Sequence, residues 1–376
     1  MTDDLARLRL RDERLVPVAR SVLRGDRLDR ESGLLVATTH DLLGVGRLAN
    51  LVRERLHGNR TYYNINRHLN PSNVCAASCK LCAYYVPWRE RESGWTYTVE
   101  QALAIAEQDV DESVSELHIV GGLHPKLKID YFEELFCSLK LRFPWIHIKA
   151  LTMVELDFIA SVSRITVEEV INRLREAGLD SCPGGGAEIF NPRIREQICD
   201  HKTDGERWLE VARRVHSVGL KSNCTMLYGH VEQAEDRVDH LLALRQLQDE
   251  TGGFQCFIPL AFHPANTELD HLPSTDGRLD LQTIAAARLL LDNVPHIKAY
   301  WIMVGEKVAQ VAQHFGANDL DGTIFDERIT RAAGGTAGTG ISRRRLEFMI
   351  RETGRTPVLR DTLYREIGTS PSAVSA

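Results

Sequence analysis

The apolar positions along the chain alternate between two kinds of pattern after about residue 60. Short runs rich in β-branched and aromatic residues predict strands at 61–68, 115–122, 146–154, 181–189, 221–229, 254–262, 296–304 and, more weakly, 319–324. Helical spacing of apolar residues marks 98–110, 130–143, 166–178, 206–219 and 237–251. Strands that alternate with helices of this length are typical of βαβ units and a parallel sheet. The sequence therefore predicts an α/β fold.

Six to eight such units form a partial or closed (β/α) barrel of the TIM type, and an open doubly wound sheet is the competing fold. Glycine and polar residues gather where the predicted strands end, at 121–125, 183–189, 226–230 and 262–267. In a barrel the functional groups lie at these carboxyl ends. We therefore expect the barrel.

The two ends of the chain lack this alternation. Residues 1–58 contain helical patterns at 6–25 and 34–58, and we expect them to form a helical flank. The barrel is expected to cover 59–325. The remainder, 326–376, is expected to be an extension with a glycine-rich loop at 334–340, a charged helix within 341–365 and a frayed tail.

Composition and charge narrow the functional classes. The chain has 376 residues, of which 43% are hydrophobic and 26% charged, as in ordinary globular proteins. A net charge of −6 argues against a nucleic-acid partner. The sequence shows neither an apolar run long enough to cross a membrane nor a signal-peptide pattern, so we expect a cytoplasmic protein without a membrane partner. The oligomeric state is left open. In a reducing compartment, clustered cysteines indicate metal binding or catalysis more than disulfides.

Three of the eight cysteines occur within eight positions, directly after the first predicted strand. Cys75, Cys79 and Cys82 have the spacing C-x3-C-x2-C, in a loop rich in residues that favour turns. We expect their thiolates to converge at the top of the barrel. The other cysteines are scattered singly and are expected to be small buried hydrophobic residues: Cys137, Cys182, Cys199, Cys224 and Cys256.

Three thiolates suit a [4Fe–4S] cluster in which one iron has no protein ligand, because such clusters usually take four cysteines. The vacant position would then bind a small molecule. A zinc site would need a fourth ligand, yet the next histidine along the chain is His118. Three unrelated core thiols are the remaining alternative.

A C-x3-C-x2-C loop after the first strand of a (β/α) barrel resembles the signature of radical S-adenosylmethionine (SAM) enzymes. The resemblance implies that Cys75, Cys79 and Cys82 hold a [4Fe–4S] cluster whose open iron binds the amino and carboxylate groups of SAM. Leu81 stands where that family often has an aromatic residue, and aromatic residues follow at Tyr84 and Tyr85. Either tyrosine would pack beside the adenine or belong to the core.

Two glycine-rich strand ends extend the resemblance. Gly121 and Gly122 match the place where radical SAM enzymes have Gly-Gly-Glu against the methionine amino group, but position 123 is leucine. A plain turn between strand and helix is the alternative. Glu188 follows three glycines and is a candidate ligand for ribose hydroxyls, or else a surface or capping carboxylate.

The cysteine loop, residues 183–189 and the stretch from 247 to 259 resemble one branch of that family. The branch contains enzymes of the futalosine route to menaquinone and the deazaflavin cofactor synthases. Within it, residues 223–230, 248–269 and 291–307 are most similar to the aminofutalosine synthases.

The resemblance implies a transferase that adds the 5′-deoxyadenosyl radical of SAM to 3-[(1-carboxyvinyl)oxy]benzoate. Aryl migration and loss of carbon dioxide would give 6-amino-6-deoxyfutalosine, and a flavodoxin or ferredoxin would supply the electron. Two alternatives stay open. The first is hydrogen abstraction, as in the cyclising enzyme of the same route or a deazaflavin synthase, and the second is a metal-binding scaffold without activity.

The two carboxylates of this enolpyruvyl benzoate need donors such as Arg, Ser, Thr, Asn or His. Arg67 lies in the first predicted strand, Asn223 and Thr225 in the fifth, and His263 follows the sixth. We expect these four residues to contact the substrate. The alternative is that they are buried structural groups, which is the more common role of a single histidine at such a place.

Overall fold

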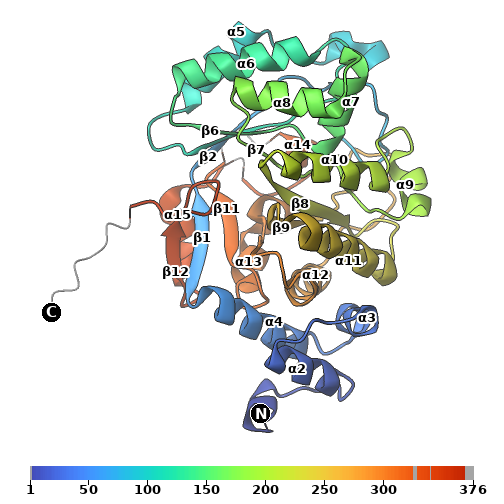
Figure 1. Ribbon diagram of the computed structural model, residues 1–376. Coiled ribbons are helices and arrows are strands. Elements are labelled where there is room, and N and C mark those ends of the chain that lie inside the picture. Colours follow the sequence, from blue (N-terminus) through green and yellow to red (C-terminus); the bar gives the residue numbers. More distant parts are fainter. Residues whose placement is uncertain (1, 325–327, 339, 369–376) are drawn as a thin grey trace, which may run out of the picture.

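The computed structural model describes residues 2–324, 328–338 and 340–368 (Figure 1). The strands are β1 (Arg60–Asn64), β2 (Asn66–Leu69), β3 (Val74–Cys75), β4 (Val86–Pro87), β5 (Glu116–Ile119), β6 (His147–Ala150), β7 (Ser181–Cys182), β8 (Lys221–Tyr228), β9 (Phe254–Ala261), β10 (His296–Ile297), β11 (Asp319–Gly322) and β12 (Thr356–Leu359). The main sheet has the order β10-β9-β8-β7-β6-β5-β2, and all its pairs are parallel.

The sheet curls into a TIM-type α/β barrel, as the sequence predicts. β1 and β2 are separated only by Ile65 and form one extended segment. β2 pairs with β5, whereas β1 pairs in parallel with β11 and β12. A bridge between Lys298 and Asp319 links the end of β10 to β11. The segment containing β1 and β2 therefore connects both edges of the main sheet.

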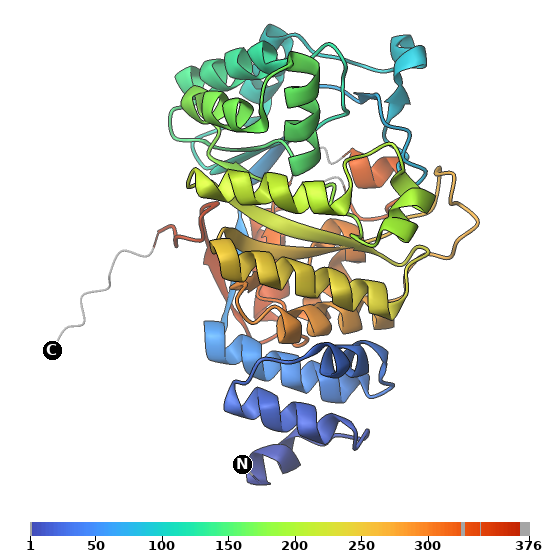
Figure 2. The same ribbon diagram turned by 45° about the vertical axis from the view of Figure 1, so that its right-hand side comes forward.

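Helices cover the outside of the strands in Figures 1 and 2. They are α5 (Val99–Asp109), α6 (Ile129–Arg142), α7 (Met153–Ser163), α8 (Val167–Ala177), α9 (Pro192–Cys199), α10 (Gly205–Ser217), α11 (Ala234–Thr251), α12 (Gly277–Leu290), α13 (Trp301–Ala312), α14 (Ile329–Ala332) and α15 (Arg343–Arg351), with a 3-10 helix at Trp88–Ser93. Helix α8 illustrates how the local sequence sets the ends and the buried face of a helix. Thr166 caps its first turn, Gly178 ends it in a left-handed conformation, and Val167, Val170 and Leu174 are buried on one face.

The N-terminal flank is helical, as predicted, but has four helices instead of two helical stretches. They are α1 (Thr2–Leu8), α2 (Leu15–Arg24), α3 (Arg30–Thr38) and α4 (Leu42–His57). Asp41 separates the last two, because its carboxylate accepts the N–H of Gly44 at 2.9 Å and so caps α4. α4 packs on α12, and α3 packs on α11 and α12, below the barrel in Figure 2.

Several predicted elements differ from the structure in extent. The strand expected at 181–189 covers only Ser181–Cys182, and the one expected at 146–154 ends at Ala150, before α7. The strand expected at 296–304 ends at Ile297, and α13 begins at Trp301, whose indole N–H donates to the Gly322 carbonyl at 3.0 Å. The run is apolar throughout, so its periodicity does not distinguish a strand from a buried helix. The helix expected within 341–365 ends at Arg351, and β12 then pairs with β1.

The proposed boundary at residue 325 lies outside the described residues, as does the tail after Gly368. The division of the chain into three parts therefore stays a prediction. The described part of the loop expected at 334–340 contains no helix or strand. Among the described residues, no helix is both long and apolar enough to cross a membrane.

Candidate active site

One cavity of about 360 Å³ occupies the interior of the barrel. The cysteine loop, glycines at the ends of β5 and β7, and residues of α7 line it near the carboxyl ends of the strands. Charged and histidine side chains from β2, β5, β6 and β11 line it deeper inside the barrel. The cavity therefore brings together the strand ends that the sequence marks as functional.

The three cysteines all line this cavity, as expected. The Cys82 N–H donates to the Cys79 carbonyl at 3.0 Å, which forms a compact turn between these two residues. Cys75 is held by the segment after β5. The Leu123 N–H donates to the Cys75 Sγ at 3.3 Å, and the Ala76 N–H donates to the Leu123 carbonyl at 2.8 Å. The loop is thus fixed against the end of β5.

The thiols fit an iron–sulfur cluster in their chemistry and placement. Three soft donors open onto one cavity that has room beside them. Burial raises the pKa of all three and brings that of Cys79 to about 12, so the free thiols are protonated and metal binding must displace their protons. Among the described residues, no group of three or more His, Cys, Asp or Glu side chains is arranged to hold a single metal ion.

Gly121 and Gly122 lie against the cysteine loop. A Cβ on Gly122 would come 2.3 Å from the Val74 carbonyl oxygen, so any larger residue would push the backbone beside Cys75. Glu155 completes this corner of the cavity: its carboxylate accepts the Gly121 N–H at 2.9 Å. Glu155 therefore places a carboxylate beside the glycine pair, where position 123 provides none.

Glu188 lines the cavity, but its carboxylate is already engaged. It forms an ion pair with Lys202; Glu188 is buried and the lysine side chain is 13% exposed. Burial opposes the charge on Glu188, yet the Lys202 ammonium outweighs this effect and lowers the pKa of the carboxyl group. The backbone of Glu188 has a φ of 45°, a conformation that non-glycine residues rarely adopt. Its role toward ribose hydroxyls stays a prediction.

Four other candidates from the sequence also line the cavity. Tyr84 is buried, with its ring edge-on to Trp95 at 5.5 Å between centroids. Asn223 and Thr225 point inward from β8, and the Thr225 hydroxyl donates to the Gly184 carbonyl at 3.0 Å.

His263 is the fourth, and its Nε2 bonds the Met303 carbonyl at 2.9 Å. That bond fixes the orientation of the ring at the cavity wall. The contacts of these four residues with cofactor or substrate stay predictions.

Arg67 departs from the expectation. It does not line the cavity, and its guanidinium donates instead to the Asp109 carbonyl at the end of α5, at 3.0 Å. Successive side chains of a strand point to opposite faces. The next residue, His68, is the one that faces the interior.

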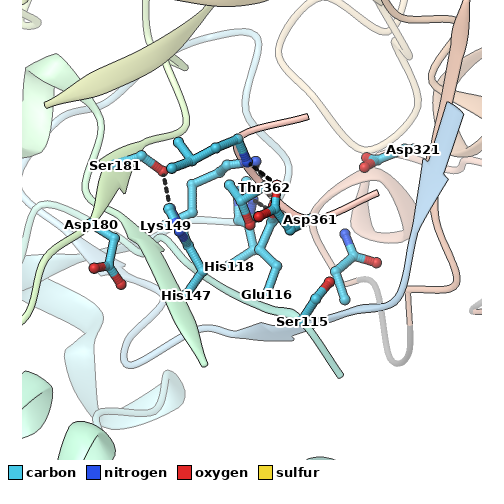
Figure 3. Close-up of polar contacts among 12 residues, drawn as sticks. Ser115, Glu116, His118, His147, Lys149, Asp180, Ser181, Asp321, Asp361 and Thr362 are labelled. Carbon is cyan, nitrogen blue, oxygen red and sulfur yellow. Dashed lines mark hydrogen bonds and ion pairs between the residues drawn. The ribbon is translucent and has the colours of Figure 1, made fainter. Parts of the chain in front are cut away.

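Charged side chains gather at the deep end of the cavity, as Figure 3 shows. The sequence did not predict this group. Lys149 donates to Glu116 at 2.7 Å, and Thr362 donates to the same carboxylate at 2.9 Å. A usable signal was present. Glu116 and His118 alternate within a buried strand, and His-Ile-Lys-Ala occurs twice, at 147–150 and 296–299. Charged residues at alternate positions of buried parallel strands indicate an inward-facing polar group.

Comparisons with known proteins place this geometry among described families. The chain matches the radical SAM superfamily over residues 69–244 and the CofH/MqnC C-terminal region over residues 251–373. It is similar to the aminodeoxyfutalosine synthase of Thermus thermophilus, with 44% identity over 95% of this chain and 97% of the relative. The Streptomyces coelicolor aminodeoxyfutalosine synthase is 41% identical over 90% of both chains. The cyclic dehypoxanthine futalosine synthase of the same organism is 35% identical over 94% of this chain and 89% of its own.

Solved structures show the same fold at low sequence identity. Methylornithine synthase (PylB) matches with a TM-score of 0.71 and 16% identity, over 90% of this chain and 96% of its own. The FeFe-hydrogenase maturase HydG from Carboxydothermus hydrogenoformans matches with a TM-score of 0.74 and 16% identity, over 94% and 81%. These two matches support the barrel architecture.

Proposed function

We propose that the chain is an aminodeoxyfutalosine synthase. The chain belongs to the radical SAM family, and to the branch of it that has the CofH/MqnC C-terminal region. The observation that carries this proposal is the 44% identity to such a synthase over 95% of the chain. Identity to the cyclic dehypoxanthine futalosine synthase is lower, at 35% over a similar length.

The proposed reaction joins SAM to 3-[(1-carboxyvinyl)oxy]benzoate, with aryl migration and loss of carbon dioxide. When bound, the [4Fe–4S] cluster supplies the electron that cleaves the sulfonium of SAM, and a flavodoxin or ferredoxin delivers that electron. Cys75, Cys79 and Cys82, which line the cavity, would hold the cluster.

The chain's own residues position the two substrates. Glu155 and the backbone beside Gly121 offer acceptors for the ammonium of SAM. Burial disfavours the charged carboxylate and raises the pKa of Glu155, and the bound ammonium would offset this effect. Tyr84 offers a ring face to the adenine. The cavity walls limit the access of water to the reacting carbons and hold them near the contact distance of about 3–3.5 Å that favours reaction.

Hydrogen abstraction is the second candidate function, because relatives that carry out other reactions share the family. The 5-amino-6-(D-ribitylamino)uracil–L-tyrosine 4-hydroxyphenyl transferase 2 of Methanosarcina barkeri is 39% identical over 85% of this chain. The two functions differ in the fate of the adenosyl group. Addition keeps it in the product, whereas abstraction releases 5′-deoxyadenosine.

The test is anaerobic reconstitution followed by incubation with SAM, dithionite and the enolpyruvyl benzoate, with mass spectrometry of the nucleoside products. We expect an adduct that carries both the adenosyl and the aryl groups. Cys82→Ser is the control and should give neither adduct nor 5′-deoxyadenosine. Recovery of 5′-deoxyadenosine alone would contradict the proposed addition, and absence of SAM cleavage in the wild type would favour the scaffold alternative.

A further inference from the structure

The deep end of the cavity carries charged groups that the residues around the cysteine loop do not explain. We call the side chains of His68, Glu116, His118, Lys149, Lys298 and Asp321 the floor cluster; all six line the cavity. Lys149 pairs with Glu116 at 2.7 Å, and Lys298 pairs with Asp321 at 2.9 Å. The His118 ring stacks on His68 with 4.7 Å between centroids, and its Nδ1 lies 4.0 Å from Glu116.

Charges below the floor cluster complete its pairing. Arg360 pairs with Asp319 at 2.6 Å, and Asp319 in turn lies 3.8 Å from the Lys298 ammonium. Three carboxylates and three cations are thus held together: Glu116, Asp319, Asp321, Lys149, Lys298 and Arg360. All six residues are less than 10% exposed.

Such a buried group is a poor way to stabilise a barrel. Removing two charges from water costs about as much as their attraction returns, and apolar side chains of the same volume often serve stability as well or better. A cluster that also faces a cavity is better explained by a polar ligand. Each ammonium has three donors, so the bonds from Lys149 to Glu116 and from Lys298 to Asp321 leave N–H groups for an anion.

The wall above the floor cluster is mostly apolar, although Thr225 also lines it. Val120, Leu227, Ile258 and Leu260 line the cavity from three strands or strand ends. His118 lies three residues before Gly121 on the same segment, which at about 3.3 Å per residue separates the floor from the glycine pair by about 10 Å. An aromatic ring with one carboxylate fits this arrangement. The apolar ring would lie between the walls, and the carboxylate would lie on the floor cluster.

We propose that the floor cluster binds the ring carboxylate of the aromatic acid substrate, with Lys149, Lys298 and His118 as its donors. This assignment rests on the proposed function. The substrate then stands upright in the barrel, with its vinyl ether directed toward the cysteine loop. The enolpyruvyl carboxylate is bonded to the vinyl group, and the two are too close together for one to lie at the cysteine loop and the other at the floor. The ring carboxylate is therefore the one that reaches the floor.

The neutral state of His118 supports this arrangement. Burial, and then the neighbouring His68, hold the pKa of His118 well below its usual range. The neutral ring carries one N–H. Its Nδ1 lies 4.0 Å from Glu116, too far for a hydrogen bond, so Nε2 can carry that N–H and donate it to the substrate carboxylate. His118 is therefore a positioning residue for the substrate.

The experiment compares two ligands in matched variants of the reconstituted enzyme. The ligands are the enolpyruvyl benzoate and 2-phenoxyacrylate, which lacks the ring carboxylate. The variants are His118→Gln, His68→Gln and the control His147→Gln. His147 lies on β6, bonds Ser181 at 2.8 Å and does not line the cavity. Affinity is measured by anaerobic equilibrium dialysis with SAM present and no reductant.

In the wild type and in His147→Gln, we expect loss of the ring carboxylate to weaken binding by about 10- to 100-fold, as for a charge-assisted hydrogen bond. In His118→Gln the ratio between the two affinities should fall by about 2- to 10-fold, the contribution of one neutral hydrogen bond, because Lys149 and Lys298 remain, while SAM binds as before. If His118→Gln does not fold, His68→Gln tests the same donor indirectly, because the His68 ring stacks on His118 and supports its orientation. A purely structural role would weaken both ligands equally and leave their ratio unchanged.

The failures of the two proposals are distinguishable. If the wild type forms the adduct from both ligands with the same affinity, the carboxylate site is refuted and the synthase function stands. If it binds the benzoate tightly but forms no adduct, the proposed function fails. An unchanged ligand ratio in both His118→Gln and His68→Gln would also refute the site.

Discussion

The ion pair between Glu188 and Lys202 should support both the fold and the cavity wall, and Lys202→Met tests this. The lysine side chain is 13% exposed and the glutamate 10%, so the substitution leaves a carboxylate buried without its cation. Breaking a buried pair in this way costs about 3–5 kcal/mol. We expect Lys202→Met to lower the free energy of unfolding by that amount.

The same figure converts to a melting temperature. The entropy of unfolding is about 2.1 cal/mol/K per residue, so a chain of 376 residues that melts as one unit loses about 4–6 °C. The double variant Glu188→Gln/Lys202→Met is the matched control. It removes the unpaired charge as well, so most of the lost stability should return.

The pH dependence of the loss follows from the direction of each shift. The pKa of Glu188 is lowered in the folded chain, so its contribution is present above its unfolded pKa and is lost as pH falls through the folded value. The pKa of Lys202 is raised, so its contribution is present below 10.5 and is lost as pH rises through the folded value. The difference between wild type and Lys202→Met should therefore be full between about pH 5 and 10 and shrink in acid.

Circular dichroism melts of reconstituted protein at about pH 4, 7 and 9 provide the measurement. A loss below about 1 kcal/mol at pH 7, the size of an exposed pair, would refute the view that this pair is buried and mutually dependent. A double variant that melts no higher than Lys202→Met would show that the lysine acts through packing and not through charge.

Three further predictions follow from the cysteine loop and from β2. Gly122→Ala should displace the backbone before Cys75 and lower the iron and sulfide content, whereas Gly277→Ala, with its nearest neighbour at 3.4 Å, should not. Equal loading of both would contradict the steric argument. Cys79→Ser should abolish SAM cleavage by the reconstituted protein. Cys137→Ser should leave it intact, because Cys137 is exposed, and the expectation that it is buried was wrong. Arg67→Met should leave the KM for the enolpyruvyl benzoate within about twofold. A large rise in KM would indicate that the Arg67 guanidinium contacts the substrate.

The local patterns of the sequence were sufficient for most of the fold. Strand and helix periods alternate over short distances, and each period reports burial of one face of one element. The same is true of the cysteine loop and the glycine strand ends, whose residues are close in the chain. The pattern failed where an apolar run lacks a period, as at 296–304, and where β12 forms by pairing with a distant strand.

Which strand residues face the cavity was decided by tertiary structure. Arg67 and His68 are neighbours in an extended segment, and only the register of β2 against β5 turns His68 inward. A shift of one residue would exchange their faces. The sequence shows that one of the two points inward and does not show which.

The sequence by itself determined a (β/α) chain with a three-cysteine loop at its first strand end, because those features rest on residue types and short spacings. Tertiary structure alone placed Glu155 beside Gly121 and built the floor cluster. Its contacts join residues 33 positions apart for Glu116 and Lys149, and 246 apart for Thr362 and Glu116. Charges at such separations have no common local pattern, and only the closed barrel brings them within bonding distance.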